Sequence, residues 1–385
     1  MIPYGRQDIS DDDIASVIAV LRSDWLTQGP TVERFEREVM EYCGARHAVA
    51  VFNATAALHL ACRALGLGPG DILWTSPNTF VASANCGLYT GASVDFVDID
   101  PRTYNMSVQA LEAKLEAAET AGKLPKILVP VHFAGQPCEM KRIYELSRFH
   151  GFKIIEDASH AIGGRYGETR IGSCEFSDIT VFSFHPVKII TTGEGGMVLT
   201  NREDLYEKLQ LLRSHGITRD DRSMQGVSDG PWYYQQIDLG YNYRMTDIQA
   251  SLGLSQMQRL DQFVARRHAL AARYTAALAS LPVVMPWQHP DAYSAYHLYP
   301  IRIKLRKQGK TRRQVFESLR AAGIGVNVHY IPVHTQPYYK QFGFKYGDYP
   351  EAERYYEEAL SLPLYSSLSI EDQDNVIAAL MRELR

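Results

Sequence analysis

Short apolar runs rich in β-branched residues alternate with helical patterns through the first 245 residues of the chain. The runs predicted as strands are 48–52, 71–75, 94–99, 127–133, 153–156, 179–184 and 197–200. Most segments between them have the spacing of amphipathic helices, such as 54–65 and 140–150. Strands that are apolar on both faces and alternate with helices predict an α/β fold with a mostly parallel sheet covered on both sides. Ligands bind such sheets outside the carboxyl ends of the strands, so we expect the chemistry there.

The pattern changes after about residue 245. A long helical stretch, 246–278, is followed by a smaller α+β pattern with strands at 297–303 and 326–330 and helices at 311–322, 350–360 and 370–384. A chain of 385 residues also exceeds the about 250–300 residues that one hydrophobic core usually serves. The sequence therefore predicts a large domain over residues 1–245 and a smaller C-terminal domain over residues 246–385.

Charge and cysteine content restrict the partners and the compartment. The net charge is −4 and no run of Lys or Arg occurs, so neither nucleic acid nor an anionic membrane is an expected partner. No run of 18 apolar residues is long enough to span a bilayer, and the first residues do not form a signal peptide. Five scattered cysteines without a CxxC pair fit a reducing compartment and predict no metal site. We expect a soluble cytoplasmic protein.

Charged side chains follow two of the predicted strands. Glu156 and Asp157 end the first of them, where they either face a ligand or cap the next turn and pair with a surface arginine. Ser183 ends the second, and Lys188 follows it between the apolar residues Val187 and Ile189. Burial lowers the pKa of a lysine and frees its amine as a nucleophile. The alternative is a surface lysine whose charged end reaches water.

A candidate phosphate site lies where strand 48–52 turns into a helix. The backbone N–H groups that begin this helix, together with the Thr55 hydroxyl, form an anion site. Asn53 can act there as an ordinary N-cap without excluding that role. Ser183 is a candidate to add a hydroxyl to the same phosphate. Phe80, which follows another strand, either stacks on a planar ring or is a core residue.

Asp157 and Lys188, taken together, resemble the pyridoxal phosphate (PLP) enzymes of the aspartate aminotransferase fold, fold type I. There a carboxylate keeps the pyridine nitrogen protonated and a lysine attaches the cofactor. Opposite charges about 4 Å apart gain about 4 kcal/mol at an effective dielectric constant of 20. That energy equals about three pKa units, which keeps the ring cationic at neutral pH and makes it an electron sink.

The resemblance is closest to one branch of this fold, the sugar aminotransferases of the DegT/DnrJ/EryC1/StrS family. The similar segments follow one another in order over nearly the whole chain: 25–29, 53–61, 156–161, 183–188, 193–196, 240–245, 329–330 and 362–365. Dehydratases of the same family carry a histidine in place of the lysine, so Lys188 argues against that reaction. An NAD-dependent dehydrogenase is disfavoured because no GxGxxG follows an early strand.

The resemblance implies a role for each candidate residue. Lys188 is the Schiff-base lysine, Asp157 the partner of the pyridine nitrogen, and His160 lies beside the ring, where many relatives have Gln. Ser183 and the amides of Ala54 and Thr55 bind the phosphate, although Asn53 stands where relatives often begin Ser-Gly-Thr. Asn242 reaches the cofactor phosphate of a neighbouring subunit, which implies a homodimer with shared active sites.

Within the family, the transaminases of the pseudaminic acid pathway are most similar, through segments 26–29, 183–192, 212–216 and 297–301. This similarity implies that glutamate aminates C4 of a UDP-linked 4-keto-6-deoxy-N-acetylhexosamine, giving UDP-4-amino-4,6-dideoxy-N-acetyl-β-L-altrosamine. The alternative is a sibling enzyme acting on another keto-sugar. The substrate-pocket candidates are Tyr4, Thr27, His297, His329 and Tyr330, with Arg244 as a candidate for a carboxylate or phosphate. The alternative for the first five is an ordinary packed or surface position, and the alternative for Arg244 is an interface salt bridge.

Overall fold

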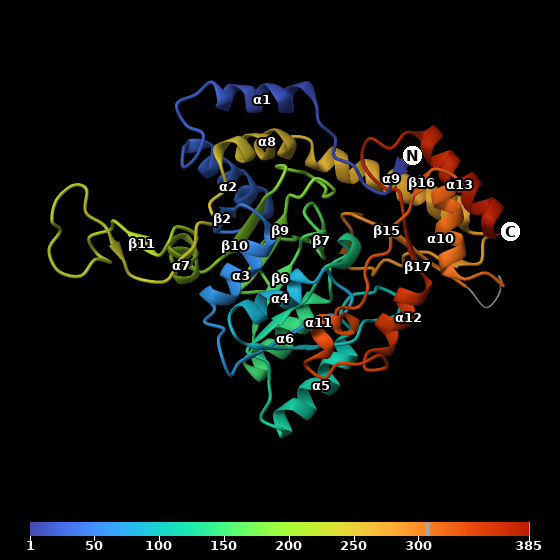
Figure 1. The fold of residues 1–385 in the computed structure, drawn as a ribbon, viewed down its shortest axis with the longest axis horizontal. Helices are drawn as coiled ribbons and strands as arrows, with labels where there is room; N and C mark the ends of the chain where they lie inside the picture. The colour runs from blue at the N-terminus through green and yellow to red at the C-terminus, as the bar shows by residue number, and fades with distance from the viewer. Residues whose placement is uncertain (305–308, 385) are drawn as a thin grey trace.

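A seven-stranded sheet forms the centre of the protein, in a computed structural model that describes residues 1–304 and 309–384 (Figure 1). Its strands, in spatial order, are β2 (His47–Val51), β10 (Gly196–Thr200), β9 (Ile179–Ser183), β6 (Lys153–Asp157), β5 (Ile127–Val129), β3 (Ile72–Thr75) and β4 (Ser93–Phe96). Only β10 runs antiparallel to its neighbours. The predicted mostly parallel sheet is confirmed.

Helices cover both faces of this sheet. One layer contains α3 (Ala54–Ala64), α4 (Ala82–Tyr89) and α7 (Glu203–Arg213), and the other contains α2 (Pro30–Cys43), α5 (Val108–Thr120), α6 (Met140–His150) and α8 (Asp247–Met257). Successive side chains of a strand point to opposite faces. Val181 therefore packs with α3 and α7, whereas Phe182 packs with α2 and α8. Because both layers are apolar, the central strands are apolar on both faces.

A smaller antiparallel sheet lies toward the C-terminus. It contains β13 (Val283–Val284), β15 (Tyr299–Ile303) and β17 (Ala359–Leu362), and its core includes side chains of α9 (Leu260–Leu278), α10 (Arg312–Ala321) and α13 (Ile370–Leu384). The first strand of the chain, β1 (Ile2–Pro3), pairs with β16 (Ile324–Gly325) beside this part. Helix α8 packs against α1 (Asp11–Leu21) and α2. Helix α8 thus packs with elements of the predicted large domain, and the boundary predicted at residue 245 stays a prediction.

The remaining elements are short. They are β7 (Arg165–Tyr166), β8 (Thr169–Arg170) and β14 (Ala292–Tyr293), which form one sheet, β11 (Ile217–Thr218) paired with β12 (Gln235–Gln236), α11 (Pro337–Lys340), α12 (Pro350–Glu358), and the 3₁₀ helices η1 (Phe133–Gly135) and η3 (Val333–Thr335). Figure 1 shows that the segment carrying β11 projects from the body as an arm, and that α1 lies alongside α8. No described helix is long and apolar enough to cross a membrane. The cytoplasmic location stays a prediction.

Several predicted elements differ from the structure. The strand predicted at 326–330 is wrong: β16 ends at Gly325, and only Asn327 makes an isolated bridge, to Ser361. The helical stretch 246–278 is two helices, because α8 ends at Met257 and α9 begins at Leu260. The strand predicted at 127–133 stops at Val129, before Pro130, which has no N–H to donate to a ladder.

Candidate active site

A cavity of about 570 Å³ lies at the carboxyl ends of β6 and β9, beside the start of α3. Eleven sequence-predicted residues line it: Tyr4, Ala54, Thr55, Phe80, Asp157, His160, Ser183, Lys188, His297, His329 and Tyr330. Eight of them precede residue 245 and three follow it, so they come from segments far apart in the sequence. The fold therefore gathers most of the predicted site into one place, where an α/β sheet is expected to bind its ligand.

Asp157 is the last residue of β6 and is buried. Its Oδ2 accepts a hydrogen bond from the Ser83 hydroxyl at 2.6 Å, and its Oδ1 accepts one from the backbone N–H of Ser159 at 3.1 Å. Both oxygens are thus oriented by hydrogen-bond donors of the protein. The carboxylate is held in one position where it can face a cationic ring.

Lys188 lies in the turn that follows β9, where its N–H donates to the carbonyl of His185. Its side chain lines the cavity, so the alternative of a surface lysine does not describe it. Burial lowers the pKa of Lys188 from 10.5 to about 8, and the negative charge of Asp157 opposes part of that shift. A substantial fraction of the amine is therefore neutral near neutral pH, as a nucleophile or general base requires.

Glu156 has a different environment from its neighbour Asp157. Adjacent strand residues point to opposite faces, and Glu156 is buried against His132, whose Nε2 lies 2.7 Å from Glu156 Oε2. Ser177 and Thr180 also donate to Glu156, at 2.5 and 3.0 Å. Burial raises the pKa of Glu156, but these hydrogen bonds outweigh burial and lower it overall. The predicted capping or surface-arginine role of Glu156 is wrong, because its partners are interior.

The start of α3 provides an anion site. The Asn53 side chain is the N-cap and accepts from Ala56 N–H at 2.8 Å, so the predicted N-cap is confirmed. The amides of Ala54 and Thr55 lie at the same helix end, at the cavity. A Cβ at Gly196 would lie 2.7 Å from the carbonyl of Asn53, so a glycine is needed for β10 to pass this close to the turn. Ser183 lines the cavity beside this terminus.

Three histidines and a tyrosine form another part of the wall. Ala134 N–H donates to His160 Nδ1 at 3.3 Å, so His160 Nε2 carries the proton and donates to the Tyr330 hydroxyl at 3.1 Å. The rings of His160 and His297 are 4.3 Å apart. Burial and the nearby positive charges lower the pKa of His160 and His297 well below 6.5, and lower that of His329 to about 3. All three rings are neutral at physiological pH.

Tyr4 and Phe80 flank this wall. The ring of Tyr4 lies 5.2 Å from that of His329, and the ring of Phe80 lies 6.2 Å from that of Tyr330. Phe80 is 59% exposed, so its alternative as a core residue is wrong. Its position beside the cavity leaves its face available to a planar ligand.

Three candidates do not line the cavity of their own chain. Thr27 is exposed and makes an isolated bridge to Thr246, Asn242 is exposed and bridges to Ser214, and Arg244 bridges to Val51. Thr27 was predicted to contact the substrate, and this arrangement does not bring it there within one chain. Asn242 was predicted to act across a subunit boundary, and its exposure is compatible with that role.

Sequence reasoning missed several residues of the site. Ser83 lies behind Asp157 and donates to it. Thr79, Asn327 and Glu194 line the cavity, and His132 is hydrogen-bonded to Glu156. Thr79 and Ser83 are four residues apart at the start of a helix that follows a strand, so they lie on one side of that turn. This spacing was the available signal. The His132–Glu156 contact joins residues 24 apart and leaves no local pattern.

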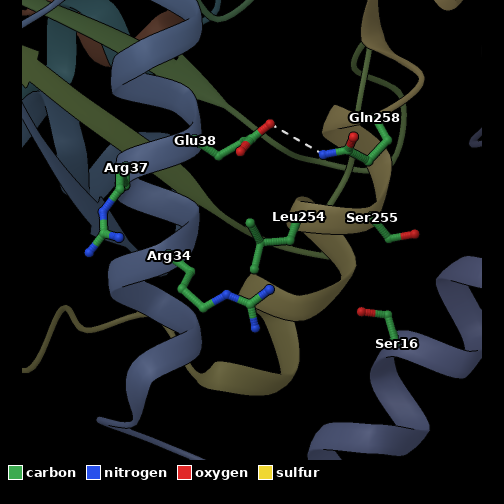
Figure 2. A pocket seen from close by; sticks show the side chains of 7 residues that line it. All are labelled: Ser16, Arg34, Arg37, Glu38, Leu254, Ser255 and Gln258. Atoms are coloured by element: carbon green, nitrogen blue, oxygen red, sulfur yellow. Dashed lines mark hydrogen bonds between the residues drawn. The ribbon is translucent and has the colours of Figure 1, made fainter.

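A second cavity, of about 420 Å³, lies between α1, α2 and α8 (Figure 2). Its lining residues are Ser16, Arg34, Arg37, Glu38, Leu254, Ser255 and Gln258. The Glu38 carboxylate accepts a hydrogen bond from the Gln258 amide at 3.2 Å, and Figure 2 shows these two side chains facing each other. None of the predicted site residues lines it, so the chemistry belongs to the first cavity.

Pyridoxal phosphate fits the first cavity. A helix N-terminus suits its phosphate, a buried carboxylate suits its ring nitrogen, and a lysine of lowered pKa suits its aldehyde. This combination, at the strand ends of a mostly parallel sheet, is that of a PLP-dependent enzyme. Residues 7–381 match the DegT/DnrJ/EryC1/StrS aminotransferase family, and the chain belongs to that family.

Individual relatives cover nearly the full length of the chain. It is 44% identical over 381 residues to the spore coat polysaccharide biosynthesis protein SpsC of Bacillus subtilis (strain 168), covering 98% of this chain and 96% of SpsC. The structure of Helicobacter pylori PseC, an aminotransferase involved in the biosynthesis of pseudoaminic acid, matches with a TM-score of 0.91 and 31% identity, over 100% of this chain and 99% of PseC. The putative sugar aminotransferase Spr1654 from Streptococcus pneumoniae, in its PMP-form, matches with a TM-score of 0.89 and 32% identity, over 98% of each chain. The predicted family is confirmed, and the predicted subgroup stays a prediction.

Proposed function

We propose that this enzyme transfers an amino group from glutamate to C4 of a UDP-linked 4-keto-6-deoxy-N-acetylhexosamine. The product would be UDP-4-amino-4,6-dideoxy-N-acetyl-β-L-altrosamine, a precursor of pseudaminic acid. The observation that carries the proposal is the pairing of Lys188 with Asp157 in one cavity of about 570 Å³. The full-length match to PseC supports the choice of sugar.

The chain's own residues account for the cofactor site. The amides of Ala54 and Thr55 and the hydroxyl of Ser183 would hold the phosphate, Asp157 the ring nitrogen, and Lys188 the covalent attachment. Bound pyridoxal phosphate supplies an electron sink for the negative charge that develops at the reacting carbon.

Lys188 moves the proton in both half-reactions. Because its pKa is about 8, Nζ can act as a base near neutral pH and then as an acid. It takes the proton from Cα of glutamate in the first half-reaction and delivers a proton to C4 of the sugar in the second. Glutamate leaves as 2-oxoglutarate, and the keto-sugar leaves as the amino-sugar.

The opposite wall orients the sugar nucleotide. His329 and Tyr330 present neutral polar groups to the cavity, and Tyr4 packs beside them. Neutral donors and acceptors suit the hydroxyl and N-acetyl groups of a sugar, because they form hydrogen bonds without burying a charge. We propose these three residues as substrate contacts.

A second copy of the chain would complete the site. The arm around β11 and β12 exposes large apolar side chains, with Val227 94%, Trp232 70% and Leu239 67% exposed. Exposed apolar groups gathered on a projecting segment favour a protein partner. A homodimer would cover the arm and bring Asn242 to the cofactor phosphate of the other subunit.

An aminotransferase acting on a different keto-sugar is the second candidate. The observation that favours it is the 44% identity to SpsC, named for spore coat polysaccharide biosynthesis, against 31% to PseC. The same Lys188 and Asp157 would serve that reaction, so the difference lies in the sugar contacts.

A single-turnover titration tests the proposal against this alternative. The enzyme is first converted with excess glutamate to the pyridoxamine phosphate form and freed of small molecules. It is then mixed with UDP-linked 4-keto-6-deoxy-N-acetylhexosamines of both stereochemical series, a 4-keto pentose and a 3-keto sugar. We expect the fastest recovery of PLP absorbance with the L-series 4-keto sugar. Faster recovery with another sugar would establish the second candidate, and no recovery with any would refute both.

A further inference from the structure

We propose that Ser83 is a positioning residue for the cofactor, because a relay of two hydroxyls, Thr79 to Ser83 to Asp157, fixes the carboxylate that faces the ring nitrogen. The inference rests on the proposed function in one respect, that the cavity holds pyridoxal phosphate. Neither side chain is the attachment point or the phosphate ligand. Their contribution is to the orientation and charge distribution of Asp157.

The distances in the relay are short. Ser83 Oγ lies 2.6 Å from Asp157 Oδ2, and Thr79 Oγ1 lies 2.8 Å from Ser83 Oγ. Both hydroxyl residues are buried, with Ser83 0% and Thr79 2% exposed. Because bulk water does not reach Ser83, no solvent molecule replaces its hydrogen bond when the hydroxyl is removed.

The chemistry of the partners sets the direction of the relay. An ionised carboxylate only accepts, so the single proton of the Ser83 hydroxyl points to Asp157. Ser83 Oγ then has only acceptor capacity left, and Thr79 must donate to it. Hydroxyls joined in this way polarise one another, so the Thr79 bond strengthens the bond that Ser83 gives to Asp157.

Both oxygens of Asp157 are oriented by this arrangement. Ser83 occupies one acceptor position of Oδ2, and Ser159 N–H, at 3.1 Å, occupies one of Oδ1. The carboxylate also lines the cavity, so its remaining acceptor positions are those available to a ring N–H. Loss of Ser83 would leave Oδ2 without its donor on the protein side and the carboxylate less well oriented.

The local fold explains why Ser83 is at this position. It stands in the first turn of α4, and its N–H donates to the carbonyl of Phe80. Thr79, Phe80 and Ser83 therefore belong to one turn between β3 and α4. The same turn places an aromatic ring beside the cavity and a hydroxyl behind Asp157.

The test compares Ser83→Ala with Ser83→Thr, which keeps the hydroxyl. Each holoenzyme is titrated with alkali while the absorbance of the bound cofactor is followed, and kcat and KM are measured. A proton on the ring nitrogen lowers the pKa of the nitrogen that joins the cofactor to Lys188. We therefore expect Ser83→Ala to raise the midpoint of this alkaline titration by about 1 pH unit. That shift is a tenfold change in the protonation equilibrium of the nitrogen that joins the cofactor to Lys188. We expect kcat to fall about 10- to 100-fold with KM nearly constant, as for a lost hydrogen bond to a charged group. Ser83→Thr should keep the titration midpoint and kcat of the unaltered enzyme.

Two further variants isolate the effect. Ser147→Ala removes another buried serine hydroxyl. Ser147 lies in α6, away from the cavity, and donates to the carbonyl of Phe152, so its loss should leave the titration midpoint unchanged. Thr79→Val removes only the second hydroxyl and should shift the midpoint in the same direction by less. If Ser83→Ala fails to fold, the Thr79→Val titration decides: no upward shift overturns the proposal.

Failure of the relay differs from failure of the proposed function. If borohydride leaves no reduced adduct on Lys188 in the unaltered enzyme, the cavity does not hold the cofactor and the proposed function fails. If the unaltered enzyme gives the adduct while Ser83→Ala has the same midpoint and kcat, only the relay is overturned.

Discussion

The two walls of the active-site cavity are built in different ways. On the sheet wall, Asp157 and Ser183 are the last residues of parallel strands, and Lys188 follows in the next turn. On the C-terminal wall, His329 and Tyr330 lie on irregular backbone held by side chains, with His329 Nδ1 2.8 Å from Ser361 Oγ. The sheet wall carries the charges, and burial keeps His297 and His329 of the other wall neutral. We expect substitutions on the sheet wall to change kcat and those on the C-terminal wall to change substrate binding.

The largest effect is expected for Lys188→Ala on the sheet wall. This substitution removes the covalent attachment and the proton-transferring amine together, so kcat should fall by more than about 10⁴-fold. Peptide mapping after borohydride treatment should find no reduced adduct at position 188. Lys123→Ala, at an exposed lysine after α5, is the matched control and should behave as the unaltered enzyme. Substantial turnover by Lys188→Ala would contradict the assigned chemistry of this wall.

Asp157→Ala should have the next largest effect. Without the carboxylate the ring nitrogen loses its proton at neutral pH, so the electron sink weakens and kcat should fall about 10²- to 10⁴-fold. The cofactor should still attach to Lys188, which borohydride trapping checks. Glu156→Gln is an informative comparison, because Glu156 is bonded to His132 and does not line the cavity. The main effect of Glu156→Gln should be a lower melting temperature. Equal losses of kcat in Asp157→Ala and Glu156→Gln would contradict a special role for Asp157 in catalysis.

The sheet wall was predictable from the sequence because its residues follow strand ends. The apolar runs at 153–156 and 179–184 are close to β6 and β9, and the chemistry-bearing side chains come directly after them. A parallel sheet brings such positions together whatever the details of packing. The residue behind them, Ser83, was not predicted, because its bond to Asp157 spans 74 residues and depends on how α4 packs.

The C-terminal wall was only partly predictable. His329 and Tyr330 were proposed as the end of a strand at 326–330, and they line the cavity although that strand does not exist. Tertiary hydrogen bonds fix this backbone, such as Tyr330 N–H to Asn78 Oδ1 at 3.3 Å, and no local pattern reveals them. Thr27 lies outside the cavity of its own chain for a related reason, since a single sequence does not show which chain a surface loop serves.

Tyr330→Phe measures the contribution of the C-terminal wall. The change removes the hydroxyl that accepts from His160 at 3.1 Å while keeping the ring in place. Loss of about one hydrogen bond should raise KM for the sugar about tenfold or less, with a smaller change in kcat. Tyr355→Phe is the matched control: Tyr355 is also buried, but its hydroxyl has no hydrogen-bond partner among the described residues. A fall in kcat as large as that of Asp157→Ala would contradict the proposal that the C-terminal wall affects mainly substrate binding.

The smallest effect is expected for the rate at which the cofactor attaches, measured as a function of pH. This rate shows whether Lys188 on the sheet wall or a histidine on the C-terminal wall is the group that titrates. In the protein freed of cofactor, burial lowers the pKa of Lys188 to about 8 and that of His329 to about 3, so Lys188 is the group that titrates between pH 7 and 9. Only the neutral amine attacks the aldehyde, so the attachment rate should rise about fivefold from pH 7 to 8 and less than twofold from 8 to 9. The same series with methylamine and free PLP corrects for titration of the cofactor itself.

Folding stability provides an independent check on the same group. The folded pKa of Lys188, about 8, lies below its ordinary value of 10.5, so the unfolded chain binds more protons between these two values. The cost of burying the ammonium is fully present below pH 8 and disappears as the pH rises toward 10.5. Stability of the cofactor-free protein, measured by urea unfolding, should therefore fall less steeply with rising alkalinity than that of Lys188→Met, which lacks this group. If the attachment rate instead reached its plateau by pH 7, a group with a pKa in the range of a histidine would control it, and the assignment of charge to one wall and neutrality to the other would be wrong.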